Sequence, residues 1–343
     1  MAASDRPARQ RARWAAVFIL AASSLGRLMV SAQTAPLALV STAWPPFTNA
    51  AGQPRFALDL VEAALSRFGI TSKTAIVSAA EFTPSLLGGR YDGSAAAWKD
   101  AQRERALLYS QPYLENRLVL IGRRGANVSA KTLADLKGRR VAIVEGYSYG
   151  DATENSGPVF VRSSSEEDSL TRLLNSGVEY TLMDELVVQY IVSNYPKESA
   201  ARLQIGSTAL ITRELYLAIR RSRPDAQSII GRFNAQLRGM IADGTYHRLL
   251  HVDWIRADVT GDGVPEYVAA NSRPGPTEPK AQQSYTLFST TAPTATPRDS
   301  KTGFYIGGNI YSDWASVPQS YKTSNSDAPD PRGSTASIFT FKW

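Results

Sequence analysis

Short apolar runs and stretches of helical spacing follow one another through the first part of the chain. Runs of strand length lie at 37–40, 70–77 and 94–97, and apolar positions with helical spacing lie between them, at 59–65 and 82–87. The order strand, helix, strand, helix, strand predicts an α/β sheet. In such sheets the ligand site lies at the carboxyl ends of the strands.

The same pattern continues through the middle of the chain. Strands are predicted at 117–122, 140–144, 159–162, 178–184 and 215–220, with an amphipathic helix at 166–176. A long amphipathic helix at 225–242 and a last helix ending near Trp254 close the pattern. Residues 271–303, rich in Pro, Ser and Thr, predict a linker with a strand near 285–289. Alternating aromatic segments at 304–311 and 337–343 suggest a small β addition.

The stretch from Asp92 to Tyr113 holds the strongest candidate for chemistry. A strand of small residues ends in a turn at Trp98–Asp100, and a short helix carrying Arg103 follows. A strand-end loop that feeds a helix N-terminus presents backbone N–H groups to an anion. An arginine one turn into that helix can add a bidentate clamp for a carboxylate, although the alternative is a solvated helix charge, as we expect for Arg105.

Three other strand ends carry candidate binding groups. Two consecutive prolines force an extended turn that presents Trp44 and Phe47; we favour Trp44 as a pocket wall and Phe47 as core. The Gly and Ser turn at 146–148 offers a second anion-receptive end. Asp184 ends an apolar strand and faces the crevice, or else caps the helix that follows.

Composition argues against several classes of site, and the N-terminal residues predict the cellular compartment. The 343 residues contain no Cys and two His, which argues against thiol chemistry, a His-rich metal centre and a His-based triad. Residues 1–32 combine an Arg-rich start, the apolar run 14–25 and Val30-Ser31-Ala32, which together predict a cleaved secretory signal peptide; an uncleaved anchor is the alternative. Five arginines lie in residues 1–32, so the net charge of +7 is largely a targeting signal and we expect no nucleic-acid partner.

A calcium-like pattern lies where the α/β part ends. Asp258, Thr260 and Asp262 place oxygen side chains at alternate positions, followed by Gly263. The position where an EF-hand has its bidentate Glu is Ala269. We therefore expect no cofactor other than possible calcium, with a turn built on Asp and Gly as the competing interpretation.

The stretch around Arg103 resembles a signature of the periplasmic solute-binding proteins for polar amino acids, solute-binding protein family 3. That pattern is a Thr, two residues, an Arg, five residues, then Phe-Ser-x-Pro-Tyr. Arg103 and the segment Tyr109-Ser110-Gln111-Pro112-Tyr113 fall on this spacing. Asp100 stands in place of the family Thr, where an acidic group would repel a ligand carboxylate.

The resemblance implies a bilobed α/β fold with a hinge that closes on a small polar ligand, such as an amino acid. It places the first lobe at 33–117 and 222–255, the second at 118–221, and leaves 256–343 as the linker and small C-terminal β extension. It implies that Arg103 takes a carboxylate, Asp184 an ammonium and Trp44 the apolar body of the ligand. The site residues that it implies are Trp44, Phe47, Ala96, Trp98, Asp100, Arg103, Gly146, Tyr147, Ser148 and Asp184.

The function implied is that of a monomeric, periplasmic binding protein, without enzymatic activity, that hands its ligand to the membrane permease of an ABC importer. Two alternatives stay open. One is a sensor or assembly protein that uses the same lobes and docks a partner on the C-terminal extension. The other is a lyase similar to cyclohexadienyl dehydratase, which would need a pocket acid or base such as Asp100, Glu145 or Glu185.

Overall fold

The computed structural model describes residues 36–250, 254–260, 262, 264–269, 278, 285–286 and 303–322. The predicted signal peptide and the aromatic segment at 337–343 lie outside these residues. Among the residues described, no helix combines the length and the apolar character that crossing a membrane requires.

The secondary structure alternates as the pattern predicts. The helices are α1 Phe56–Ser66, α2 Ala79–Leu87, α3 Ala101–Ala106, α4 Asp151–Glu154, α5 Glu166–Leu174, α6 Glu185–Asn194, α7 Pro196–Arg202, α8 Ala226–Ala242 and α9 Thr245–Leu250, with 3-10 turns at Leu133–Leu136 and Gln319–Tyr321. The strands are β1 Leu37–Thr42, β2 Ser72–Val77, β3 Gly93–Ala97, β4 Leu107–Tyr109, β5 Leu114–Arg123, β6 Arg140–Val144, β7 Val159–Ser163, β8 Tyr180–Asp184, β9 Leu203–Arg220, β10 Trp254–Ala257, β11 Glu266–Ala269, β12 Tyr285–Thr286, β13 Phe304–Ile306 and β14 Asn309–Tyr311.

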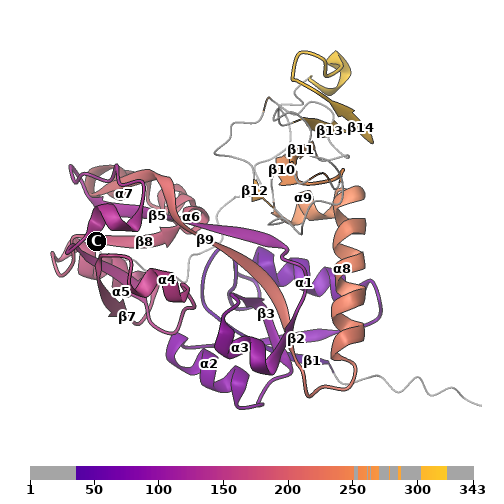
Figure 1. Ribbon diagram of the computed structural model, residues 1–343, viewed down its shortest axis with the longest axis horizontal. Helices are drawn as coiled ribbons and strands as arrows, with labels where there is room; N and C mark the ends of the chain where they lie inside the picture. Colours follow the sequence, from indigo (N-terminus) through magenta and orange to yellow (C-terminus); the bar gives the residue numbers. More distant parts are fainter. Residues whose placement is uncertain are drawn as a thin grey trace, which may run out of the picture. The chain divides into compact units, whose positions relative to one another are not determined.

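The α/β part forms two lobes that share the long strand β9 (Figure 1). The strand order is β2-β1-β3-β9-β5-β8-β6-β7, with β4 also paired to β9. Residues 216–220 of β9 pair with β3 and β4, whereas residues 203–215 pair with β5. The second lobe was predicted to run to residue 221; this boundary needs correction, because one strand of 18 residues is long enough to serve both sheets.

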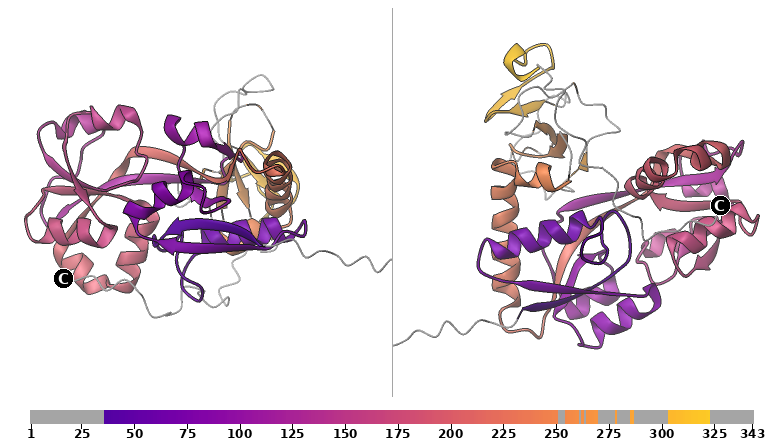
Figure 2. Two further views of the ribbon diagram at one scale, coloured as in Figure 1. Left: turned by 90° about the horizontal axis from the view of Figure 1, so that it is seen from below. Right: turned by 180° about the vertical axis from the view of Figure 1, so that it is seen from behind.

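Both lobes contain parallel strands, whose carboxyl ends lie at the same edge of the sheet. In the first lobe β1 pairs in parallel with β2 and β3, and in the second β6 pairs in parallel with β7 and β8. Helices α1, α8 and α9 pack together in the first lobe, while α5 and α6 pack on β8 in the second (Figure 2). The carboxyl ends of β1, β3, β6 and β8 carry the loops that the sequence marked as candidate sites.

The C-terminal extension is a separate sheet of strand order β12-β10-β11-β13-β14. The last helix was predicted to end near Trp254, but α9 ends at Leu250 and Trp254 begins β10, so the extension starts before residue 256. The first two residues of β10 are both buried, each in a different apolar cluster. Trp254 packs in an apolar cluster of the extension with Phe304, while Ile255 packs in the core of the α/β part.

Candidate functional site

A cleft opens between the two lobes where the ends of β1 and β3 meet the loop that follows β6. Its volume is about 350 Å³, including the part open to solvent. The lining residues are Ser41, Thr42, Trp44, Phe82, Ala96, Trp98, Arg103 and Leu215, with Gly146, Tyr147 and Ser148 from the second-lobe loop. Residues of both lobes thus face one space, as a site that closes on a ligand requires.

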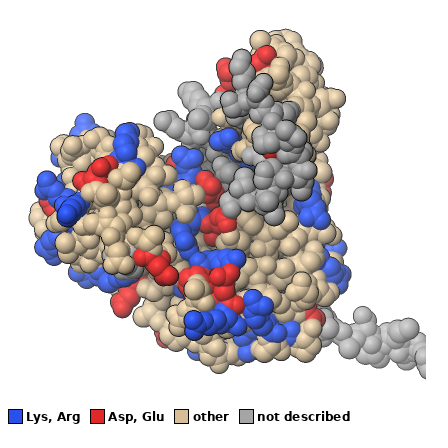
Figure 3. Space-filling view, viewed as in Figure 1, with Lys and Arg blue, Asp and Glu red and all other residues tan. Residues whose placement is uncertain are grey.

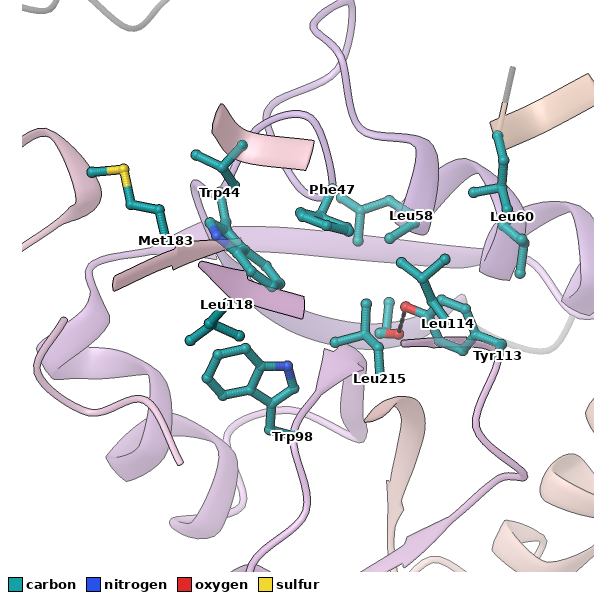
Figure 4. Close-up of a cluster of buried hydrophobic side chains, with 14 of the residues drawn as sticks. Trp44, Phe47, Leu58, Leu60, Trp98, Tyr113, Leu114, Leu118, Met183 and Leu215 are labelled. Atoms are coloured by element: carbon teal, nitrogen blue, oxygen red, sulfur yellow. Dashed lines mark hydrogen bonds between the residues drawn. The ribbon is translucent and has the colours of Figure 1, made fainter. Parts of the chain in front are cut away.

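Aromatic rings fill the middle of this cleft. The ring centroids of Trp44 and Trp98 are 5.6 Å apart, and Tyr147 lies 5.9 Å from Trp44 and 5.5 Å from Trp98, all in edge-on arrangements. Trp44 and Trp98 belong to the same buried apolar cluster as Leu118 and Met183 (Figure 4). Tyr147 belongs to the second lobe and both tryptophans to the first, so these ring contacts join the two lobes.

Arg103 is almost entirely enclosed, with 3% of its surface exposed. Its guanidinium donates to the Trp98 carbonyl at 3.2 Å, to Thr83 Oγ1 at 2.7 Å and to the Gly146 carbonyl at 2.9 Å. Burial lowers the pKa of Arg103, and the Asp100 carboxylate, 3.4 Å from Nε, partly offsets this. The two terminal nitrogens of this arginine therefore donate to the protein itself, whereas Nε has no hydrogen-bond partner in the described part of the chain.

Asp100 occupies the place predicted for a ligand anion. Its carboxylate caps α3 by accepting from the Arg103 backbone N–H at 2.7 Å, and it also accepts from the Ser148 hydroxyl. A carboxylate of the chain thus already accepts from one backbone N–H at this helix N-terminus, and a ligand anion would have to compete with it there.

Polar contacts across the cleft hold the lobes together. Three hydrogen bonds join residues of different lobes. Arg103 donates to the Gly146 carbonyl, Ser148 donates to Asp100, and Thr42 Oγ1 lies 3.4 Å from the Tyr147 hydroxyl. Gly146 has φ +78°, and a Cβ there would lie 2.8 Å from the Ala79 carbonyl oxygen of α2. Only glycine therefore lets this loop approach the first lobe so closely.

Asp184 is buried, with 1% of its surface exposed. Its carboxylate accepts from the backbone N–H of Leu186 at 2.7 Å, from the backbone N–H of Arg117 at 3.0 Å and from Asn116 Nδ2 at 3.1 Å. It thus caps α6, the alternative that the sequence left open, and it does not line the cleft. Asn116 also accepts from the Trp98 indole at 2.7 Å, so Asp184 lies directly behind the cleft wall.

Glu166 is a second buried carboxyl group on this side. It is the first residue of α5, 5% exposed, and its Oε2 has no hydrogen-bond partner in the described part of the chain. Burial, with a smaller contribution from the charge of Asp184, raises the pKa of Glu166 to about 8, against the lowering effect of the facing Trp44 indole. Burial likewise raises the pKa of Asp184 to about 7.

Sequence reasoning found most of the cleft and missed the groups that lie behind its wall. The predicted site residues that line the cleft are Trp44, Ala96, Trp98, Arg103, Gly146, Tyr147 and Ser148. Phe47 is core, as we favoured, and stacks on Trp44 at 4.2 Å; Asp100 lies behind Ser148 and Arg103. For Glu166 the sequence indicated only the start of an amphipathic helix, and nothing in the sequence pointed to Asn116. Each residue comes near the cleft only through the packing of strands that are distant in sequence.

The loop predicted to bind calcium forms hydrogen bonds typical of a turn. Asp258 Oδ1 accepts from the Asp262 backbone N–H at 3.1 Å and from Thr260 Oγ1 at 3.4 Å, and Asp262 Oδ1 accepts from the Val264 N–H. Among the described residues, no group of three or more His, Cys, Asp or Glu side chains could hold a metal ion. Calcium here stays a prediction, which calorimetry with Ca²⁺ on chelator-treated protein tests.

The charged surface shows no large area of one sign on the face seen in Figure 3. Basic and acidic side chains both gather along the boundary between the lobes.

Comparison with known proteins identifies the family. The model of the bacterial extracellular solute-binding proteins, family 3, matches residues 38–256. ABC transporter arginine-binding protein 1 of Escherichia coli (strain K12) is 24% identical over 216 residues, which are 61% of this chain and 86% of that protein. The putative ABC transporter arginine-binding protein 2 of the same organism is 23% identical over 239 residues, 67% of this chain and 96% of that protein.

Solved structures show the same fold. An ancestral arginine-binding protein bound to arginine has a TM-score of 0.53 and 21% identity, covering 62% of this chain and 95% of its own. The GluR0 ligand-binding core from Nostoc punctiforme in complex with L-glutamate has a TM-score of 0.52 and 20% identity, covering 62% and 97%. The family match spans more than half of the chain and coincides with the two lobes. This protein therefore belongs to the bacterial extracellular solute-binding proteins, family 3.

Proposed function

We propose that this protein captures a small polar solute of the amino-acid class in the periplasm and delivers it to the permease of an ABC importer. The predicted signal peptide supports the compartment, and the family supports the role. The cleft would close on the solute, and the closed form would be the one that the permease receives. The extension from Trp254 onward would either take no part in ligand capture or contact the permease.

The observation that carries this proposal is the composition of the cleft. Its walls come from both lobes, and its contacts between lobes are a few hydrogen bonds and aromatic edges. A hydrogen bond contributes about 1 kcal/mol, or about 1.5–3 kcal/mol where one partner is charged, as in the contacts of Arg103 and Asp100. A ligand that bridges the lobes can shift an open–closed equilibrium of this size. Trp44, Trp98 and Tyr147 would stack on the apolar part of the solute.

A thermal-shift screen of the mature chain against amino acids, polyamines and organic acids tests the proposal. A ligand at 100 times its dissociation constant should stabilise the folded protein by about 2.7 kcal/mol. Hits confirmed by calorimetry, together with no turnover of prephenate or arogenate, would support the binding role. If no solute of these classes shifts the melting temperature, the proposed function is wrong.

A further inference from the structure

The described residues that line the cleft are almost all uncharged. Of these eleven residues, six have apolar or aromatic side chains, three end in a hydroxyl group, one is glycine, and Arg103 carries the single charge. Burial raises the pKa of Tyr147, so its hydroxyl group stays neutral as well. The lining therefore offers a solute apolar surface, neutral hydrogen-bonding groups and one cation.

The charge of this cation is already balanced within the chain. The Asp100 carboxylate lies 3.4 Å from Arg103 Nε and accepts from the Arg103 backbone N–H, so the two residues together add no net charge. Arg103 Nε has no hydrogen-bond partner in the described part of the chain, and the hydroxyl groups of Ser41 and Thr42 also line the cleft. Donors for the carboxylate of an amino acid therefore remain.

A cationic side chain of the solute would find no ionised partner in this lining. Asp184 lies behind the cleft wall and accepts three hydrogen bonds from the chain itself. Glu166, whose pKa burial raises to about 8, holds its proton at neutral pH, and neither carboxyl group is among the lining residues. A guanidinium or ammonium side chain would leave water without compensation, and the charge of Arg103 would oppose it.

The aromatic rings of the lining contact one another more than they face open space. Trp44 stacks on Phe47 with 4.2 Å between ring centroids, and Trp98 and Tyr147 both meet Trp44 edge-on. In an edge-on pair the edge of one ring lies against the face of the other, so these faces are less open to a cation. The rings therefore offer mainly apolar contact surface.

We propose that the solute is a zwitterionic amino acid with an uncharged, mainly apolar side chain, and that the cleft selects against cationic side chains. This inference rests on the proposed function and narrows its solute class. The side chain would lie against Trp44, Trp98 and Tyr147, and the carboxylate near Arg103. Because the ammonium and the carboxylate of a zwitterion offset each other, an uncharged side chain keeps the cleft neutral.

Two pairs of amino acids of similar shape and different side-chain charge test the inference, namely L-citrulline against L-arginine and L-norleucine against L-lysine. Calorimetry on the full mature chain at pH 7 should give an affinity for the neutral member that is at least about tenfold higher in both pairs. This wild-type comparison decides the inference by itself. Equal or tighter binding of the charged member in either pair would overturn it and leave the proposed function standing.

Ala96→Asp adds a carboxylate to the lining of the cleft. The affinity for L-arginine relative to L-citrulline should rise by about tenfold or more, because the guanidinium gains an ionised partner. Ala235→Asp adds the same charge on the exposed surface of α8, and should keep the wild-type ratio within about twofold. Melting temperatures establish that both variants fold.

An unchanged ratio in folded Ala96→Asp would also overturn the inference. If none of the four amino acids binds, the inference is overturned, and the proposed function is then decided by its own broader screen.

Discussion

At the scale of single residues, the buried carboxyl of Glu166 makes stability depend on pH. Its pKa of about 8 in the folded protein exceeds the ordinary value of 4.5. Between these two values the folded state binds more protons than the unfolded state, so the free energy of unfolding falls as the pH rises. The titratable groups facing Glu166 are Asp184, Tyr147 and Tyr149.

We therefore predict that the ligand-free wild-type protein loses melting temperature from pH 5 to pH 8. In Glu166→Gln the melting temperature should depend less steeply on pH. The dependence that remains should come from Asp184, whose pKa is also raised, to about 7. Calorimetric melting curves of both proteins at four pH values measure the difference. Parallel curves would show that Glu166 does not titrate in this range.

Arg103 has a structural role as well as its predicted binding role. Arg103→Ala removes donors to the Trp98 and Gly146 carbonyls and to Thr83, and leaves Asp100 without its cation. The free energy of unfolding should fall by about 3 kcal/mol, the upper end for buried groups that lose a charged hydrogen-bond partner. Urea unfolding measures this loss.

Arg105→Ala is the control for that measurement, because Arg105 is exposed on the same helix. It should change the free energy of unfolding by no more than about 0.5 kcal/mol. Equal effects of the two substitutions would show that the contacts of Arg103 contribute nothing specific to stability.

At the scale of elements, the loop after β6 determines how closely the lobes meet. Gly146 and Gly138 both have positive φ angles, +78° and +74°, but only a Cβ at Gly146 would approach the other lobe, at 2.8 Å from the Ala79 carbonyl. Gly146→Ala and Gly138→Ala should thus each cost about 1 kcal/mol from backbone strain.

Only Gly146→Ala should also hold the lobes apart. We expect it to increase the radius of gyration measured by small-angle X-ray scattering and to weaken binding of the best ligand from the screen, since closure becomes harder. Gly138→Ala should leave both quantities as in wild type. The same scattering profile for the two variants would contradict the role assigned to this loop.

At the scale of the whole molecule, the C-terminal extension is part of the folded unit. Ile255 is 0% exposed and packs in the core of the α/β part, and His247 Nε2 contacts the Val268 carbonyl of β11 at 3.0 Å. Ile255→Ala should lower the free energy of unfolding by about 2–4 kcal/mol in a single transition.

Ile310→Ala is the matched control, because Ile310 is 42% exposed in the hairpin of β13 and β14. It should lower the free energy of unfolding by less than about 1 kcal/mol. Two separate transitions in either protein would show that the extension unfolds independently of the lobes.

The sequence by itself determined the architecture of the lobes and one wall of the cleft. Apolar periodicity is local, so the strands and helices around Leu39 and Leu60 could be read from spacing alone. The signature around Arg103 and the prolines beside Trp44 fixed two strand ends, since strand ends in an α/β sheet meet at one crevice.

Only the tertiary structure decided what these groups contact. It paired Arg103 with Asp100, turned Asp184 toward the N-terminus of α6 and brought Glu166 against Trp44, more than a hundred residues away in sequence. In the folded protein β9 also pairs with strands of both lobes, and the first strand of the extension begins at Trp254. The physical reason is that burial and pairing of charges depend on neighbours distant in sequence, which no local spacing encodes.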